Sequence, residues 1–487
     1  MMYTTEKLKD FVPSCFKGEG TAHIKGQDIP YHTVAEDNVI YDKDGHALAS
    51  VYSYSYFRSD VTDTNSRPVL FCYNGGPGTS SMYVHAGFMG PRRLSYAEVD
   101  RPTSLPPYEV IDNPDCLLDI ADIVLIDPVN TGFGLLIDET KGDQFFGIEQ
   151  DGEAILTFIE KWLHKYNRFL SPKYLVGESY GCTRNAVVAG FGVEGTKNRD
   201  FDIAFDGIVM IGNSVTPGKF FGKEMPVEKA IICFESWAAI NWYHNHPSDQ
   251  TLEEFVSEAK AFGESDYLLA LYQGEDIDPE FRKEVKEKVM YYTGVSSQYL
   301  EENNLNINEW SYRSEVLREK GLSVSRLDGR ITRPAFEPWT VEQKTYDDAL
   351  DDRYDAAFLS CVCNDLLPRM NVQLNRTYMS YFNAFSDENK GYKWDNSEPS
   401  GTTGEHLNNA MRKNFGMRVF FANGWYDTAT YTGYIDYLLN HQGLPKERIC
   451  RRDYPSGHMI YLGEENCHML SSDIREFVLG GMPHNKD

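Results

Sequence analysis

The sequence predicts an α/β fold in which helices cover both faces of a mostly parallel, doubly wound sheet. Three observations favour it. Short apolar runs bounded by Gly, Pro, Asp or Asn recur through the first half of the chain, as buried parallel strands require. A stretch with apolar residues at helical spacing separates two of these runs, and a further run appears near the C-terminus. Strand alternating with helix is the pattern of a doubly wound sheet.

The predicted elements follow in chain order. We expect buried strands at residues 69–73, 120–126, 174–176, 208–211 and 419–422. Between the second and third of these strands, residues 149–166 repeat apolar side chains such as Ile155 and Ile159 at helical spacing. This stretch is therefore predicted to be a helix.

A long insertion interrupts the sheet. Residues 216–346 are rich in charged and aromatic side chains at helical spacing, notably at 252–272 and 279–292, and show few strand signals. We expect a core of residues 1–215 and 347–487 and a mostly helical cap at 216–346, placed where the strands open. A separate helical domain is the alternative, but no Pro/Gly/Ser-rich linker flanks the insertion.

The composition allows a large core and disfavours anionic partners. The chain has 487 residues, of which 41% are hydrophobic, enough for a large apolar core. The formal net charge is -26, from 47 basic and 73 acidic residues. Nucleic acid and anionic membrane surfaces attract cationic patches, so neither is an expected partner.

The N-terminus and the cysteines favour a reducing compartment. No cationic stretch leads into an apolar run at the start, and no apolar segment of transmembrane length follows, so we expect a soluble, cytoplasmic protein unless a leader was removed. Nine cysteines form an odd number without framework spacing, as suits free thiols. Cys361 and Cys363 lack nearby ligand partners, so no zinc site is expected. We predict no cofactor.

The pentapeptide GESYG at residues 177–181 directly follows a predicted strand. A serine at a sharp strand-to-helix turn, with glycine two residues to either side, is the nucleophile elbow of α/β hydrolases, because side chains at the glycine positions would clash. Ser179 is therefore the candidate nucleophile, and the fold class becomes that of an α/β hydrolase. The pentapeptide alone is also compatible with an ordinary turn.

A serine nucleophile needs a general base, and the base needs a third group that holds its tautomer. In α/β hydrolases these follow in the order serine, acid, histidine. Asp427 lies just beyond the last predicted strand and is the candidate acid. His458 is the candidate base, because Gly457 before it lets the loop pass close to the nucleophile.

An oxyanion also has to be held. The loop NGGPG at residues 74–78 follows the first predicted strand, and its glycines allow a close approach of backbone N–H groups to a ligand. A simple turn is the alternative. The position after an early strand favours a functional loop.

Taken together, these motifs resemble those of the serine carboxypeptidases, peptidase family S10. The resemblance is carried by residues 74–78, 127–133, 177–181, 207–213, the Asp427 region and residues 457–459. It covers most of the chain. The style of residues 84–93 and 326–330 looks more like the bacterial-type branch than like the secreted fungal and plant enzymes.

The resemblance implies a role for each catalytic residue. Ser179 attacks the scissile carbonyl, His458 relays the proton and Asp427 orients His458. The backbone N–H groups of Gly76 and Tyr180 form the oxyanion hole.

The resemblance also implies a substrate. The family removes single residues from peptide C-termini, and its carboxylate-binding residues map to Asn74, Gly75 and Glu178. A glutamate binds a carboxylate only if one of the two is protonated, because two bare anions in a dry site repel each other. We therefore expect a peptide substrate with a free C-terminus and activity favoured by mildly acidic pH.

The sequence departs from the secreted enzymes at three positions of this region. Thr79 replaces the usual cysteine, so that disulfide is absent. Cys72 replaces a tryptophan and Phe88 replaces a second glutamate. Losing that glutamate removes a like charge that would help keep Glu178 protonated, while desolvation by Phe88 could serve the same end, so the net effect is open. Our hypothesis is that burial keeps Glu178 protonated.

Other readings stay open at this point. His85, Arg92 and Arg93 lie near the loop and could supply a cation for the substrate carboxylate, although structural roles suit all three. A serine esterase or acyltransferase is the alternative function, because an acyl-enzyme can also react with an alcohol. A non-catalytic binding protein on the same scaffold is the third. The oligomeric state is not indicated.

Overall fold

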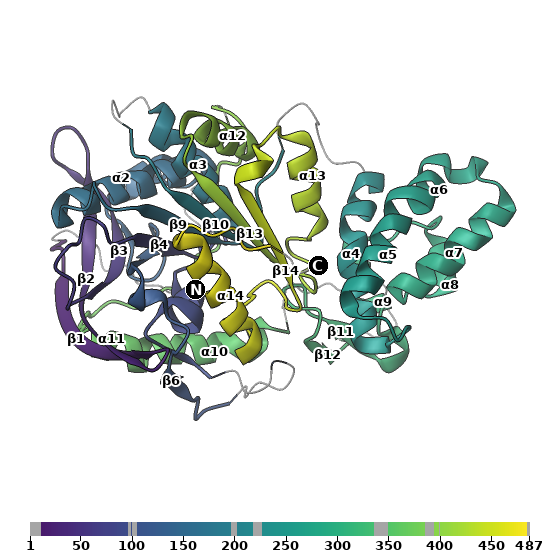
Figure 1. Cartoon of the computed structure of the whole chain (residues 1–487), viewed down its shortest axis with the longest axis horizontal. Helices are drawn as coiled ribbons and strands as arrows, with labels where there is room; N and C mark the ends of the chain where they lie inside the picture. The colour runs from purple at the N-terminus through teal and green to yellow at the C-terminus, as the bar shows by residue number, and fades with distance from the viewer. Residues whose placement is uncertain are drawn as a thin grey trace.

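The computed structural model describes residues 11–95, 99, 105–195, 202–217, 226–335, 349–384, 394–398 and 400–484. A ten-stranded sheet forms its centre, in the order β1-β2-β3-β7-β4-β9-β10-β13-β14 with β8 paired to β3 (Figure 1). The bounds are β1 Cys15–Ile24, β2 Gln27–Tyr41, β3 Ala47–Arg58, β4 Val69–Tyr73, β7 Asp122–Asp127, β8 Leu135–Leu136, β9 Lys173–Glu178, β10 Gly207–Ile211, β13 Arg418–Gly424 and β14 Ile449–Tyr454.

The six strands from β7 to β14 are parallel, as the sequence predicts. All five predicted strands are present. The three N-terminal strands and β8 pair antiparallel and were not predicted. In β1 most side chains are exposed or half-buried, so this strand carries no continuous apolar run.

Alternate side chains of the central strands pack into two different hydrophobic cores, one on each face of the sheet. In β4, Leu70 and Cys72 pack into one apolar cluster, whereas Val69, Phe71 and Tyr73 pack into the other. The second cluster includes α2 (Ile148–Tyr166), α3 (Tyr180–Glu194), α12 (Thr403–Lys413) and α13 (Gly433–His441). The first includes α10 (Asp351–Cys361) and α14 (Glu464–Val478). Helices therefore cover both faces of the sheet, and the predicted helix at 149–166 is α2.

Short elements complete this part of the chain. They are α1 (Met82–Val84), a π-helical turn at His85–Met89, the paired strands β5 (Arg92–Leu94) and β6 (Val110–Asp112), and α11 (Leu367–Arg369).

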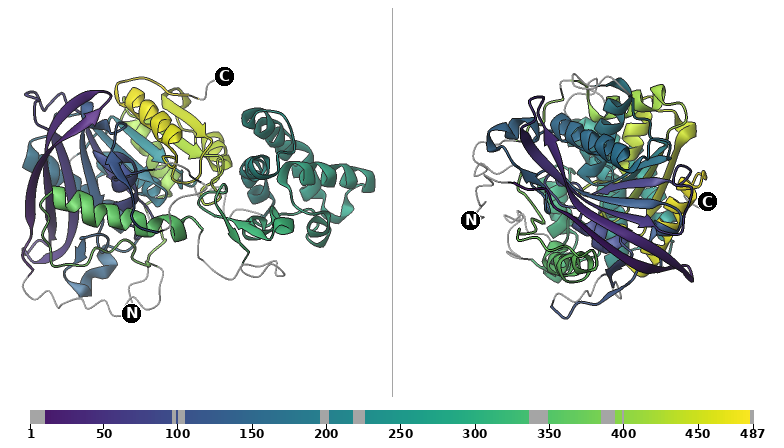
Figure 2. Two further views of the ribbon diagram at one scale, coloured as in Figure 1. Left: turned by 90° about the horizontal axis from the view of Figure 1, so that it is seen from below. Right: turned by 90° about the vertical axis from the view of Figure 1, so that its left-hand side faces the viewer.

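A helical lobe stands beside the sheet (Figure 2). It consists of α4 (Pro226–Asn245), α5 (Leu252–Phe262), α6 (Leu268–Gln273), α7 (Pro279–Thr293), α8 (Ser297–Glu302) and α9 (Glu309–Glu315). These helices enclose an apolar core of their own, and Trp425 and Tyr431 from the sheet side pack against it. A hairpin of β11 (Leu322–Val324) and β12 (Thr332–Pro334), which was not predicted, follows α9. The boundary expected at residue 346 lies outside the described residues.

Two further features of the described residues concern membrane-spanning helices and cysteines. Among the described residues, no helix combines the length and the apolar character needed to span a membrane. All nine cysteines are free thiols, and seven of them are buried.

Candidate active site

The predicted site residues lie at or after the ends of parallel strands, at one edge of the sheet. Asn74 follows β4, Ser179 follows β9, Asp427 follows β13 and His458 follows β14. The carboxyl ends of parallel strands meet at the same edge, where open α/β sheets bind ligands. The fold therefore brings together residues that are up to 384 positions apart.

Ser179 stands on a strained turn between β9 and α3. Its backbone has φ 60° and ψ -127°, a left-handed conformation that costs a non-glycine residue free energy. The turn is held from both sides, because the Ser179 N–H donates to Ile211 O at 2.8 Å and the Ser214 hydroxyl donates to Ser179 O at 2.7 Å. The geometry is that of a nucleophile elbow.

His458 is held by a buried aspartate. Its Nδ1 lies 2.7 Å from Asp427 Oδ2, and Asp427 is fully buried. The Thr430 hydroxyl donates to Asp427 Oδ2 at 2.6 Å and lies 3.2 Å from His458 Nδ1. Burial alone would lower the pKa of His458, but Asp427 beside it raises that pKa above its ordinary value. The imidazole can therefore accept and hold a proton.

The His458 ring lies beside the end of β10, the strand whose last residue binds the Ser179 N–H. The His458 N–H donates to Leu327 O at 2.6 Å, which ties its loop to the segment before β12. A Cβ on Gly212 would lie 3.0 Å from the His458 ring. Gly212 directly follows Ile211, the residue that binds the Ser179 N–H. Ser179 and His458 therefore flank the same strand end.

The loop at 74–78 lies directly against the elbow. A Cβ on Gly75 would lie 2.4 Å from Tyr180 N and 2.7 Å from Glu178 O, so only glycine permits this approach. Tyr180 begins α3, and the first N–H groups of a helix have no partner within it. Because Gly76 follows Gly75, the N–H groups of Gly76 and Tyr180 belong to neighbouring stretches of backbone, and their role as an oxyanion hole stays a prediction.

Glu178 is buried beside this loop. The Asn74 side-chain amide donates to Glu178 Oε1 at 3.0 Å, and Asn74 Oδ1 accepts from Val84 N at 3.0 Å, which fixes the amide orientation. Burial raises the pKa of Glu178 to about 7, against the opposing effects of His458, Tyr461 and Asn74. Phe88 stacks on Tyr461 with ring centroids 5.7 Å apart and so helps exclude water. This pKa agrees with the hypothesis that burial favours protonated Glu178.

The three cations considered from the sequence have protein partners instead. His85 Nε2 lies 2.7 Å from the Tyr56 hydroxyl, and burial lowers the pKa of His85 to about 3, so this imidazole is neutral. Arg92 pairs with Asp112 and Asp365. Arg93 is fully buried and pairs with Glu464 at 2.5 Å. These contacts favour the structural roles.

Three residues at the site were not predicted from the sequence, namely Thr430, Arg184 and Tyr461. Thr430 holds the aspartate and histidine together, Arg184 donates to Asn74 O at 2.7 Å, and Tyr461 lies against Glu178. A hydroxyl three residues after the candidate acid was a usable signal for Thr430. The packing of α3 brings Arg184 to the loop at 74–78, and no local sequence motif indicates this contact.

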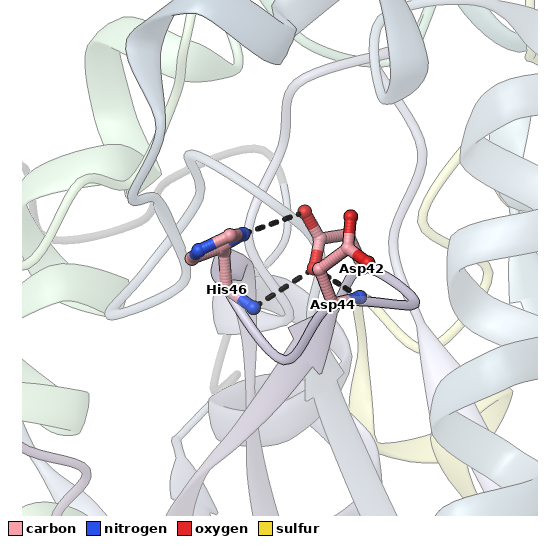
Figure 3. A group of neighbouring side chains, drawn as sticks. All are labelled: Asp42, Asp44 and His46. Carbon is pink, nitrogen blue, oxygen red and sulfur yellow. Dashed lines mark hydrogen bonds and ion pairs between the residues drawn. The ribbon is translucent and has the colours of Figure 1, made fainter.

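One cluster in the described part of the chain has the composition of a metal site. Asp42, Asp44 and His46 lie together on the loop between β2 and β3 (Figure 3). Asp42 Oδ1 accepts from the N–H groups of Asp44 and His46 at 2.9 and 2.8 Å, and Asp42 Oδ2 lies 3.1 Å from His46 Nδ1. The Asp42 carboxylate is therefore engaged in holding the turn.

Among doubly wound folds, the α/β hydrolases are those that set a serine on a strained turn between strand and helix and a histidine at a later strand end. This molecule is of that class. The chain belongs to the serine carboxypeptidase family, because the model of that family matches residues 45–458.

Relatives and solved structures agree with this membership. Serine carboxypeptidase-like 20 of Arabidopsis thaliana is 30% identical over 170 residues, 34% of this chain and 33% of the relative. Serine carboxypeptidase 1 of Hordeum vulgare is 28% identical over 188 residues, 37% of this chain and 35% of the relative. The matched stretches thus span about a third of these plant proteins. The bacterial-type branch stays a prediction.

The fold is that of a solved carboxypeptidase. The crystal structure of Kex1(delta)p, a prohormone-processing carboxypeptidase from Saccharomyces cerevisiae, superposes with a TM-score of 0.55. The superposition covers 93% of this chain and 91% of that chain at 12% sequence identity. This confirms the predicted α/β-hydrolase fold.

Proposed function

We propose that this protein is a serine-type carboxypeptidase that removes C-terminal residues from peptides through an acyl-enzyme. One observation carries the proposal. Glu178, a buried carboxyl whose pKa lies at about 7, is held by Asn74 one residue before Ser179. A protonated carboxyl beside a nucleophile suits a substrate that presents its own carboxylate next to the scissile bond.

Three residues carry the proposed chemistry. Ser179 Oγ attacks the scissile carbonyl while His458 accepts its proton, and His458 then returns this proton to the departing amine. Water repeats the sequence to release the acyl group. Asp427 holds the histidine Nδ1 and stabilises the imidazolium through the 2.7 Å contact.

Backbone donors stabilise the developing charge. We assign the oxyanion hole to the N–H groups of Gly76 and Tyr180, because the loop at 74–78, which follows β4, approaches the elbow closely at Gly75. Such donors act strongly where water is excluded, and they need no reorganisation during the reaction.

We assign recognition of the substrate C-terminus to Asn74, Gly75 and Glu178. The Asn74 amide is fixed by Val84 N, and its NH₂ group can donate to a carboxylate as well as to Glu178. The Gly75 N–H supplies a backbone donor, and protonated Glu178 supplies an O–H donor. The partner proposed is a peptide with a free C-terminus.

The architecture and setting follow from the same proposal. We propose that residues 1–215 and 347–487 form the catalytic core and that 216–346 form a cap whose Leu327 backbone contacts the His458 loop. Nine free thiols support a reducing, cytoplasmic location. No metal or cofactor takes part in the proposed steps.

A pair of matched peptides tests the proposal. One peptide carries a free C-terminus and its twin is amidated, and hydrolysis is followed for wild type and Ser179→Ala. We expect cleavage of the free peptide only, and fluorophosphonate labelling of wild type but not of the variant. Equal cleavage of both twins would indicate the esterase-type alternative, and absent labelling would indicate a binding protein.

A further inference from the structure

Arg184 is a buried cation directly behind the nucleophile elbow. It lies on α3, five residues after Ser179, and is 1% exposed. Its Nε donates to Asp151 Oδ2 at 2.7 Å, and its Nη1 donates to the Asn74 backbone oxygen at 2.7 Å. The planar guanidinium can serve both acceptors at once because its donors form a rigid fork.

Two aromatic rings hold the guanidinium in place. Arg184 lies 4.9 Å from the Tyr73 ring centroid and 5.2 Å from that of Tyr180, within range for cation–π contact. Tyr73 immediately precedes Asn74, and Tyr180 immediately follows Ser179. One buried side chain therefore touches both segments that converge on the reacting carbonyl.

The contact with Asn74 fixes the direction of the next N–H. A trans peptide unit is planar, so its C=O and N–H point in opposite directions. The Asn74 carbonyl points toward Arg184 in the interior, and the N–H of the same peptide unit belongs to Gly75. That N–H is therefore turned away from Arg184. The bond from a cation to the carbonyl also polarises the unit and strengthens the N–H as a donor.

We propose that Arg184 is a positioning residue that aims the Gly75 N–H at the C-terminal carboxylate of the substrate. The inference rests on the proposed carboxypeptidase function. Replacing Arg184 should therefore impair the hydrolysis only of substrates that carry this carboxylate. A structural role alone, in which Arg184 only neutralises buried Asp151, would affect all substrates alike.

Arg184→Lys separates the two roles. Lysine keeps a positive charge beside Asp151, but its single ammonium cannot reproduce the fork to both acceptors. Two substrates are compared, a blocked dipeptide with a free C-terminus and p-nitrophenyl acetate, which has no carboxylate. We expect kcat/KM for the dipeptide to fall about tenfold to a hundredfold, mainly through KM, and ester hydrolysis to stay within about threefold.

Arg168→Lys is the matched control. Arg168 is 2% exposed, donates to Asp122 Oδ2 at 2.5 Å and to Arg67 O at 2.8 Å, and lies at the opposite edge of the sheet, where β7 begins. Arg168→Lys should leave the ratio of dipeptide to ester kcat/KM at the wild-type value. An unchanged ratio in Arg184→Lys as well, or an equal loss on both substrates, would overturn the inference.

Asp151→Asn covers the case in which Arg184→Lys does not fold. It keeps Arg184 but removes its ionic anchor, so the same selective loss on the dipeptide is expected, and an unselective loss overturns the inference. Fluorophosphonate titration counts the active sites in every sample. If wild type is labelled and hydrolyses the ester but not the dipeptide, the proposed carboxypeptidase function fails instead.

Discussion

At the scale of single residues, Glu178 governs how the proposed reaction responds to pH. Its pKa of about 7 means that the protonated form dominates below neutrality and the anion above it. For wild type, kcat/KM on a blocked dipeptide should therefore fall by up to tenfold per pH unit above about pH 7. In Glu178→Gln, whose amide stays a donor at every pH, this alkaline decline should disappear.

An ester without a carboxylate is the internal control for this pH profile. Its kcat/KM should lack the Glu178-dependent decline in both proteins, because no substrate anion meets the Glu178 anion. A dipeptide profile that is flat from pH 5 to 8 in wild type and unchanged in Glu178→Gln would reject the assigned role.

The same residue should weaken the fold at high pH. Its folded-state pKa is raised from 4.5 to about 7, so the folded state holds the proton more tightly than the unfolded state does. Stability from this group is therefore lost as pH rises from about 4.5 to about 7. By urea unfolding, Glu178→Gln should gain up to about 3 kcal/mol over wild type between pH 5 and pH 8. A difference that does not change with pH would contradict this.

The candidate catalytic residues carry the clearest marks in the sequence. Ser179 directly follows a strand, and Asp427 and His458 come three and four residues after later strands, so chain order and strand ends separate them from other candidates. Thr430 and Arg184 have no such local mark. They reach the site through side-chain contacts across the fold, which a single sequence does not encode in any spacing.

At the scale of elements, the elbow depends on a close approach between β9 and α3. A Cβ on Gly177 would lie 2.3 Å from Gly181 O, whereas a Cβ on Gly181 would meet its nearest atom at 3.2 Å. We expect Gly177→Ala to lower the free energy of unfolding by about 2 to 4 kcal/mol and to abolish most activity, because backbone must shift.

Gly181→Ala is the comparison variant in the same turn. Its neighbours need move only a few tenths of an ångström, so it should cost less than half as much stability as Gly177→Ala. Thermal unfolding and fluorophosphonate labelling measure both effects. Equal losses in the two variants would show that the close approach at Gly177 does not control the turn.

The sheet was predictable where strands are buried on both faces. β4, β9 and β10 are buried at every position, and their continuous apolar runs are visible in the sequence. β1 instead alternates exposed and half-buried side chains and contains two glycines, so no apolar run marks it. The β11–β12 pair has three residues in each strand, too few for any period to show.

At the scale of the whole molecule, ion pairs join the helical lobe to the sheet. Lys260 on α5 pairs with Glu235 on α4 at 3.0 Å and also with Asp436 on α13. Asp436 in turn binds Arg451 on β14 at 2.5 Å. Burial raises the pKa of Glu235, and Lys260 opposes this rise, so Lys260 offsets the cost of a buried carboxylate.

Lys260→Met should therefore loosen the lobe. We expect the free energy of unfolding to fall by about 1 to 3 kcal/mol, measured by urea unfolding. Amide hydrogen exchange in α4 and α5 should become faster. Lys288→Met is the control, because Lys288 pairs with Asp266 at 3.2 Å on the surface, and it should cost at most about 1 kcal/mol. Equal effects of the two variants would contradict the inference that Lys260 joins the helical lobe to the sheet.

Mass spectrometry of a mixed peptide library tests the central claim most directly. After incubation with wild type, we predict ladders in which each peptide loses single residues from its C-terminus. Peptides with amidated C-termini, and all peptides incubated with Ser179→Ala, should stay intact. Internal cleavage, or an unchanged library in the presence of fluorophosphonate-reactive wild type, would contradict the assignment of this site to carboxypeptidase chemistry.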